Sequence, residues 1–85
     1  MSGSDKRTTA LILTMEECGE LTQACSKVIR RGGDEKSIQG LIEEAGDVLC
    51  MIDLLINLGL LRRIDLDEQK KYKKLKLKSW SDLYE

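Results

Sequence analysis

The chain has 85 residues, a formal net charge of −1 at pH 7, three cysteines and no histidine. A chain of this length forms one domain whose own core is only marginally stabilising, so we expect a partner chain or a bound metal to contribute. The lack of histidine excludes Ser-His and Cys-His nucleophile pairs and the Glu-x-x-His ligands of di-iron bundles, which leaves carboxylates and lysines for chemistry. The odd number of cysteines argues against a disulfide framework, and we expect Cys18, Cys25 and Cys50 to be small buried hydrophobic residues.

The polar N-terminal segment, residues 1–7, is expected to be a disordered lead, and its composition indicates no signal peptide. Residues 8–30 contain no proline and repeat apolar residues with a helical period, which predicts a first long helix. Its main apolar stripe consists of Leu11, Met15, Cys18, Cys25 and Ile29, and Leu21 and Val28 widen it. Glu17 and Glu20 lie on the flank of this stripe, where an interface with another helix can still include them.

A pair of glycines at residues 32–33 predicts the end of the first helix, and Asp34 or Ser37 is expected to cap a second helix that runs to about residue 58. Between residues 48 and 61 the second helix is apolar on nearly all sides, and fourteen residues are too few to span a membrane. A helix without a polar face is buried on several sides. We therefore expect two long antiparallel helices that self-associate into a helical bundle.

Two pairs of carboxylates stand out on these helices, Glu17 with Glu20 and Glu44 with Asp47. Residues three apart on a helix lie on one face, one turn apart. The second pair shares its face with the apolar residues Leu41, Val48, Met51, Leu55 and Leu58. Converging carboxylates on apolar stripes need a positive charge between them, and hard cations such as Mg²⁺ and Mn²⁺ take oxygen ligands. The pattern therefore predicts a site for a divalent cation.

Asp65 and Glu68 have the spacing of a capping box, which predicts a third, shorter helix that continues to about residue 78. Six of the fourteen basic residues are lysines between Lys70 and Lys78. These lysines belong either to a solvated, weakly amphipathic helix or to a surface that leans over the acidic site and meets substrate phosphates. The C-terminal tail, residues 79–85, is expected to pack onto a neighbouring subunit.

Three stretches carry a family resemblance: Glu-Glu-Cys-Gly-Glu-Leu at 16–21, Ser-Lys-Val-Ile-Arg-Arg-Gly at 26–32 and Leu-Ile-Glu-Glu-Ala-Gly-Asp-Val-Leu at 41–49. They resemble the MazG-like all-α nucleoside triphosphate pyrophosphohydrolases, in particular the short single-domain members of bacteriophages and bacteria. The resemblance covers roughly residues 11–78. It agrees with an all-α domain over residues 8–78 in which two long antiparallel helices and a shorter C-terminal helix complete a four-helix-type bundle by homo-oligomerisation.

The resemblance implies Mg²⁺-dependent cleavage of a ribo- or deoxyribonucleoside triphosphate between its α and β phosphates, with Mn²⁺ as the alternative ion. The products would be the monophosphate and pyrophosphate. By position, the metal ligands would be Glu17, Glu20, Glu44 and Asp47, and Glu16 would be an accessory catalytic carboxylate. The resemblance also implies that two chains shape the nucleotide pocket, in a homodimer or homotetramer.

Basic residues near the two carboxylate pairs are the candidates for contact with substrate phosphates. On the first helix and its exit these are Lys27, Arg30 and Arg31, and on the third helix they are Lys70, Lys73 and Lys74. Other partners are not expected: there is no segment for a membrane, and the net charge of −1 argues against a nucleic-acid binder. The expected location is the cytoplasm of a bacterium or of a phage-infected host.

Two alternative functions remain open from the sequence. Phosphoribosyl-ATP pyrophosphohydrolase is an enzyme of similar size, fold and acidic motif, and only its substrate separates it from the first reading. A non-enzymatic helical dimerisation module would use the acidic clusters as ordinary surface charge. That second alternative predicts Glu44 and Asp47 on a polar face, whereas the sequence places them on a stripe with Val48 and Met51.

Overall fold

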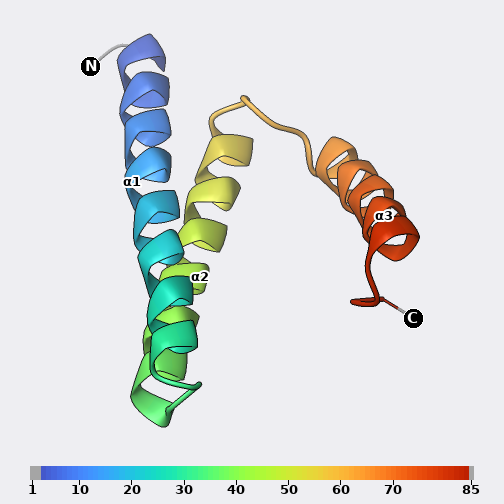
Figure 1. Ribbon diagram of the computed structural model, residues 1–85. Coiled ribbons are helices and arrows are strands. Elements are labelled where there is room, and N and C mark those ends of the chain that lie inside the picture. Colours follow the sequence, from blue (N-terminus) through green and yellow to red (C-terminus); the bar gives the residue numbers. More distant parts are fainter. Residues whose placement is uncertain (1–2, 85) are drawn as a thin grey trace.

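The computed structural model describes residues 3–84 and shows an all-α chain, as the sequence predicts. Helix α1 spans Gly3–Arg30, α2 spans Glu35–Asn57 and α3 spans Arg63–Trp80 (Figure 1). No helix within the described residues combines the length and hydrophobicity that a membrane crossing requires.

Helix α1 begins at Gly3, so residues 3–7 are helical instead of forming the expected disordered lead. Met1 and Ser2 lie outside the described residues. Asp5 in the first turn favours the helix, because a carboxylate near the N-terminus interacts well with the helix dipole. Arg7 also ties this segment to the end of α2, where its Nε donates a hydrogen bond to the carbonyl oxygen of Leu58 at 3.0 Å. A polar composition alone did not distinguish a solvated helical turn from a disordered lead.

The turn between α1 and α2 is closed by hydrogen bonds at both helix ends. Gly32 and Gly33 have positive φ angles of 66° and 74°, and the amide of Gly33 donates to the carbonyl of Val28 at 2.9 Å. Asp34 is the N-cap of α2, and its carboxylate accepts a hydrogen bond from the amide of Ser37 at 2.8 Å. The predicted break and the Asp34 cap are thus confirmed, and the turn sends α2 back along α1.

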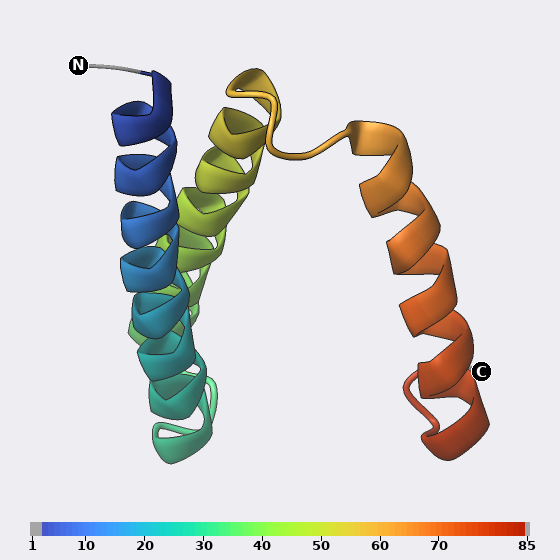
Figure 2. The same ribbon diagram turned by 90° about the horizontal axis from the view of Figure 1, so that it is seen from above.

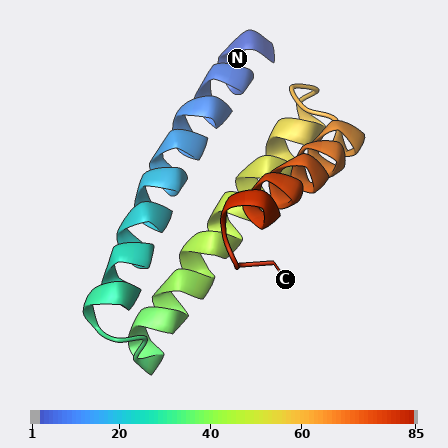
Figure 3. The same cartoon turned by 45° about the vertical axis from the view of Figure 1, so that its right-hand side comes forward.

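Helices α1 and α2 form an antiparallel hairpin and pack along their length (Figures 1 and 3). The α1 residues that face α2 are buried or half-buried and recur every three or four positions: Ala10, Thr14, Glu17, Leu21, Ala24 and Val28. The α2 residues that face α1 include the predicted stripe of Leu41, Val48, Met51, Leu55 and Leu58, together with Ser37 and Glu44. Small side chains at Ala10 and Ala24 allow the two helices to approach closely.

The predicted main stripe of α1 does not lie in this interface. Met15 and Ile29 are 73% and 82% exposed, and Cys18, Cys25 and Cys50 are exposed as well. The expectation of buried cysteines is therefore wrong for the single chain. The hairpin uses a neighbouring face of α1 that carries smaller side chains, because the more apolar face has no second element to pack against.

The hairpin has two different open sides. One side has a groove between the two helices, and we call this side the carboxylate face. The groove is lined by Glu20 and Lys27 of α1 and by Gly40 and Glu43 of α2. Half a helical turn away lies the opposite side, the apolar face, which carries exposed large side chains of both helices. These are Leu11, Met15 and Ile29 of α1 and Ile38, Ile42 and Leu49 of α2.

Helix α3 stands apart from the hairpin (Figures 1 and 2). An ion pair between two exposed side chains, Arg63 Nη2 and Asp53 Oδ1 at 2.9 Å, links it to α2. Such a pair contributes little to stability. The chain is accordingly extended, with a radius of gyration of 15.6 Å, where a compact chain of this length has about 12 Å.

The start of α3 differs from the predicted capping box. Its N-cap is Arg62, which makes no side-chain cap hydrogen bond, and Asp65 lies inside the first turn. The Asp65 carboxylate instead accepts two hydrogen bonds from the Arg62 guanidinium, at 2.9 and 3.1 Å. The carboxylate is thus used in a bidentate ion pair with the N-cap residue instead of in a cap hydrogen bond. Helix α3 also continues to Trp80, two residues beyond its expected end.

Replacing Asp34 with alanine removes the acceptor for the Ser37 amide and should lower the melting temperature by several degrees, measured by circular dichroism. Asp34→Asn keeps an acceptor and should retain most of the stability, and Asp82→Ala serves as an exposed control. Hydrogen bonds from Ser37 lower the pKa of Asp34. Its contribution is therefore present above the ordinary pKa of aspartate and is lost as the pH falls through the lowered value. An unchanged melting temperature at neutral pH would contradict this role.

Candidate metal centre

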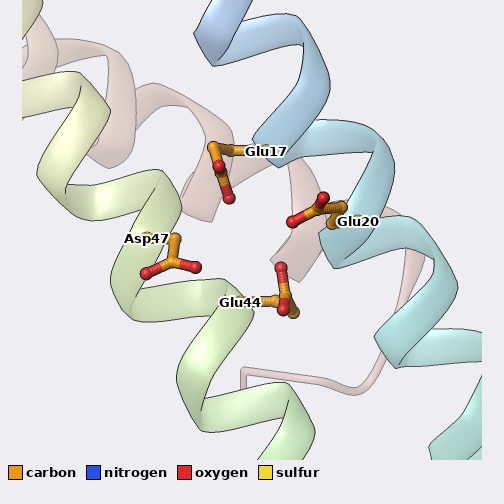
Figure 4. Close-up of side chains that lie close together, drawn as sticks. All are labelled: Glu17, Glu20, Glu44 and Asp47. Carbon is orange, nitrogen blue, oxygen red and sulfur yellow. The ribbon is translucent and has the colours of Figure 1, made fainter.

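Four carboxylates from the two helices of the hairpin meet at one point on the carboxylate face. Glu17 and Glu20 lie one turn apart on α1, and Glu44 and Asp47 lie one turn apart on α2. One oxygen from each side chain lies within 4.8 Å of the corresponding oxygens of the other three. Figure 4 shows the four side chains pointing from opposite sides toward a common centre. The antiparallel turn thus converts two local pairs into one cluster.

A repeated local pattern explains why the two pairs face each other. Residues 16–20 read Glu-Glu-Cys-Gly-Glu and residues 43–47 read Glu-Glu-Ala-Gly-Asp, so each helix carries two acids, a small residue, a glycine and a third acid. Two antiparallel helices that pack through the same positions of one pattern are related by an approximate two-fold axis. The axis relates Glu17 to Glu44 and Glu20 to Asp47, so that Glu17 lies beside Asp47 and Glu20 lies beside Glu44. This repeat is visible in the sequence. It would have indicated how the two helices face each other, which the spacing within each carboxylate pair does not.

The two central carboxylates are partly buried, and each has one oxygen without a hydrogen-bond partner. Oε2 of Glu17 and Oε2 of Glu44 are both buried without a hydrogen bond, while Glu20 and Asp47 are exposed. Within residues 3–84, the ion pairs join other acids and do not reach these four. A buried acceptor without a partner costs free energy, and a carboxylate costs more. An all-oxygen set with two unsatisfied atoms suits a hard divalent cation.

The electrostatics of the cluster favour protonation when no cation is bound. The pKa of Glu17 is raised, first by desolvation and then by repulsion from Glu20 and Asp47. The pKa of Glu44 is raised first by a side-chain hydrogen bond with Glu20, which needs a proton on one of the two carboxyl groups, and then by desolvation. A bound cation would reverse both effects, because it favours the charged form of each carboxylate.

The two remaining glutamates of the repeated pattern, Glu16 and Glu43, are exposed and do not belong to the cluster. Glu16 is close enough to Glu17 to add to its raised pKa. Glu43 lines the groove beside Glu44. The structure therefore separates four converging carboxylates from two that flank them.

The groove on the carboxylate face runs from Glu20 and Glu44 to the turn between the helices and has a volume of about 1060 Å³. Of the sequence candidates for phosphate contact, Lys27 and Arg31 line it, whereas Arg30 does not. Lys36 lines it as well, and sequence reasoning missed this residue. The sequence could have indicated Lys36, because this residue lies in the first turn of α2, about two helical turns before Glu44.

The lysines of α3 are not brought to the carboxylates of their own chain. Lys70, Lys73 and Lys74 line a separate depression on α3 together with Leu77 and Tyr84. The ammonium group of Lys74 lies 5.1 Å from the centre of the Tyr84 ring, and Lys73 lies 5.9 Å from that of Trp80. Within one chain, the expectation that these three lysines lean over the acidic site is therefore wrong, because α3 does not fold back onto the hairpin.

Comparison with protein families gives one informative match. The model of the MazG nucleotide pyrophosphohydrolase domain matches residues 5–78, which is most of the chain, and the chain therefore belongs to this family. The members of this family are generally nucleotide pyrophosphohydrolases and depend on divalent metal ions. No curated protein and no solved structure matches the chain.

The substitution Glu44→Gln keeps the size of the side chain but removes one of the converging charges. It should raise the melting temperature of the metal-free protein at pH 8 and abolish the rise that Mg²⁺ causes in the wild type. Glu68→Gln, at an exposed position of α3, is the matched control and should change neither value. A lower metal-free melting temperature, or an undiminished effect of Mg²⁺, would contradict the site.

The metal-free wild type should also lose stability as the pH rises. Because the folded pKa values of Glu17 and Glu44 are raised, the folded state binds protons more readily than the unfolded state. The stability from this protonation is present below the ordinary pKa of glutamate and is lost as the pH rises through the raised values. The stabilisation by Mg²⁺ should therefore grow over the same pH window, and thermal melts with Mg²⁺ or with a chelator measure it.

Proposed function

We propose that the protein is a Mg²⁺-dependent nucleoside triphosphate pyrophosphohydrolase. It cleaves a ribo- or deoxyribonucleoside triphosphate between the α and β phosphates and releases the monophosphate and pyrophosphate, with Mn²⁺ as the alternative ion. The observation that carries this proposal is the convergence of Glu17, Glu20, Glu44 and Asp47, two of which have buried oxygens without partners. Membership of the MazG family supports the reaction class.

The four carboxylates have different positions and therefore different roles. Glu17 and Glu44 lie deeper and would hold the cation, whereas Glu20 and Asp47 are more exposed, so that a phosphate group could approach them. When bound there, the cation supplies charge neutralisation on the phosphate oxygens and orients them for in-line attack. Glu16 lies one turn before Glu20 and would be an accessory carboxylate of the site.

A second copy of the chain completes the pocket in a homodimer or homotetramer. The apolar face of the hairpin supports this part of the proposal, because its exposed leucine, isoleucine and methionine side chains lie on the same side of both helices. The separate position of α3 also supports it. A helix that does not pack on its own hairpin is free to place Lys70, Lys73 and Lys74 over the carboxylates of the other copy.

The central test is a panel of ribo- and deoxyribonucleoside triphosphates, with phosphoribosyl-ATP included, scored by release of pyrophosphate in the presence of Mg²⁺. The wild type should release pyrophosphate from at least one nucleoside triphosphate. Glu17→Ala and Asp47→Ala should each abolish the release while the helical content remains, because each removes a ligand of the cation. Glu68→Ala is the control and should remain active. Full activity of both site variants would refute the assignment.

Mixing two inactive variants tests whether the α3 lysines act on the other copy. One variant carries Asp47→Asn, and the other carries glutamine at Lys70, Lys73 and Lys74 together. In a mixed dimer, intact lysines of the first chain meet intact carboxylates of the second, and random pairing should restore about a quarter of the wild-type activity. Lysines that act within their own chain would restore none. Sedimentation of the wild type should show a dimer or a larger assembly, and a stable monomer at micromolar concentration would contradict this arrangement.

A further inference from the structure

The segment that follows α3 turns back toward this helix and closes the depression on it (Figure 2). Ser81 holds the turn, because its amide and its hydroxyl both donate to the carbonyl oxygen of Leu77, at 2.9 and 2.6 Å. The hydroxyl oxygen of Ser81 in turn accepts from the amide of Leu83 at 3.3 Å. The Tyr84 ring then lies with its centre 5.1 Å from the ammonium group of Lys74. The depression has a volume of about 640 Å³ and is accessible, because α3 does not pack against the hairpin.

The charge of this depression is positive. Asp67 is the acid that lines it, and the lysines that line it are Lys70, Lys71, Lys73 and Lys74. None of these side chains forms an ion pair with another described residue. Two further acids of this part of the chain, Glu68 and Asp82, do not line the depression. Most of the positive charge is therefore uncompensated within the described residues, and it would attract an anion that carries several charges.

Aromatic rings adjoin the same lysines. Tyr84 lines the depression and is 44% exposed, and Trp80, beside Lys73, is 65% exposed. An ammonium group next to an aromatic ring places a positive charge beside a flat apolar surface. Lysines bind phosphate groups through charge, and nucleobases stack on exposed aromatic side chains. The depression thus combines the two features that recognise a nucleotide, whereas an inorganic phosphate would use the lysines alone.

We propose that this depression binds a nucleoside triphosphate without a metal ion, with its phosphates on Lys70 and Lys74 and its base on the Tyr84 ring. Lys70 and Lys74 lie one turn apart on one face of α3, so both can contact one chain of phosphates. The choice of ligand rests on the proposed function, whereas the site itself lies within one chain and apart from the carboxylates of that chain. In the proposed homo-oligomer, the same surface brings the phosphates toward the metal centre of the other copy, and Tyr84 contributes to the choice of base.

Equilibrium dialysis of the full chain with a chelator measures this binding in the absence of hydrolysis. The ligands are the common ribonucleoside triphosphates and inorganic triphosphate, and the wild type should bind both kinds. The double substitution Lys70→Gln/Lys74→Gln should weaken the binding of both kinds about tenfold, because it removes two contacts with phosphate. Lys76→Gln/Lys78→Gln is the matched control. It removes the same charge from α3 outside the depression and should change the affinities little.

Tyr84 separates recognition of the base from attraction of the phosphates. Tyr84→Leu should weaken the binding of nucleoside triphosphates about tenfold and leave that of inorganic triphosphate unchanged, because only the nucleotides have a base that can stack. Tyr84→Phe keeps the ring and should bind like the wild type. Trp80 is the single tryptophan of the chain, so quenching of its fluorescence by a bound nucleotide would locate that nucleotide on α3.

Equal losses in the two lysine variants, an unchanged affinity of Tyr84→Leu for every nucleoside triphosphate, or binding without quenching would overturn the site. A single-stranded oligonucleotide that binds more tightly than the triphosphates would overturn the choice of ligand. Circular dichroism controls for folding, and the substituted residues lie outside the contact between α1 and α2. The panel with Mg²⁺ reports separately on the proposed function. Hydrolysis in that panel without metal-free binding would refute the α3 site alone, whereas metal-free binding without hydrolysis of any triphosphate would refute the function and support the site.

Discussion

The constraint on which the structure depends is the placement of four carboxylates at the centre of a two-helix interface. Glu17 and Glu44 occupy positions of the hairpin where an ordinary hairpin would carry leucine, and each has a buried oxygen without a partner. Desolvation and then repulsion raise the pKa of Glu17, and a hydrogen bond with Glu20 and then desolvation raise the pKa of Glu44. Without a cation, the charged forms of these carboxylates therefore weaken the contact between the helices. A divalent cation between them would join α1 to α2 through charge. On the proposed function, stability and chemistry would thus depend on the same four side chains.

This placement also explains why the single chain has so small a core. Among the described residues the buried apolar ones are Ala10, Ala24 and Leu55, because the acids take central positions of the contact between α1 and α2. The large apolar side chains lie instead on the opposite side of the hairpin, which the carboxylates leave free. On the proposal of self-association, a surface of that kind over two helices would form part of a bundle, and a chain of 85 residues would gain further burial from a partner.

The sequence predicted the features that depend on local period and local capping. The three helices, the Asp34 cap and the two carboxylate pairs follow from spacing along the chain, and the structure contains all of them. The rotation of α1 about its axis was not predictable, since a stripe with Met15 and a stripe with Ala10 and Ala24 both suit a helix interface, and only the partner decides between them. The separation of α3 from the hairpin was not predictable either, because its basic composition suits a helix that packs on the hairpin as well as one that does not.

The net charge of −1 is the sum of an acidic part and a basic part of the chain. This distribution affects how a nucleotide would bind at the site. The chain up to residue 60 contains ten acidic and six basic residues, whereas the remainder contains five acidic and eight basic residues. Four of the acids converge at the metal centre, so a free triphosphate would meet repulsion there. On the proposed function, the cation must therefore arrive before the nucleotide or with it. On the same proposal, the lysines of α3 from a second copy would act on the phosphate charge that the cation leaves uncompensated.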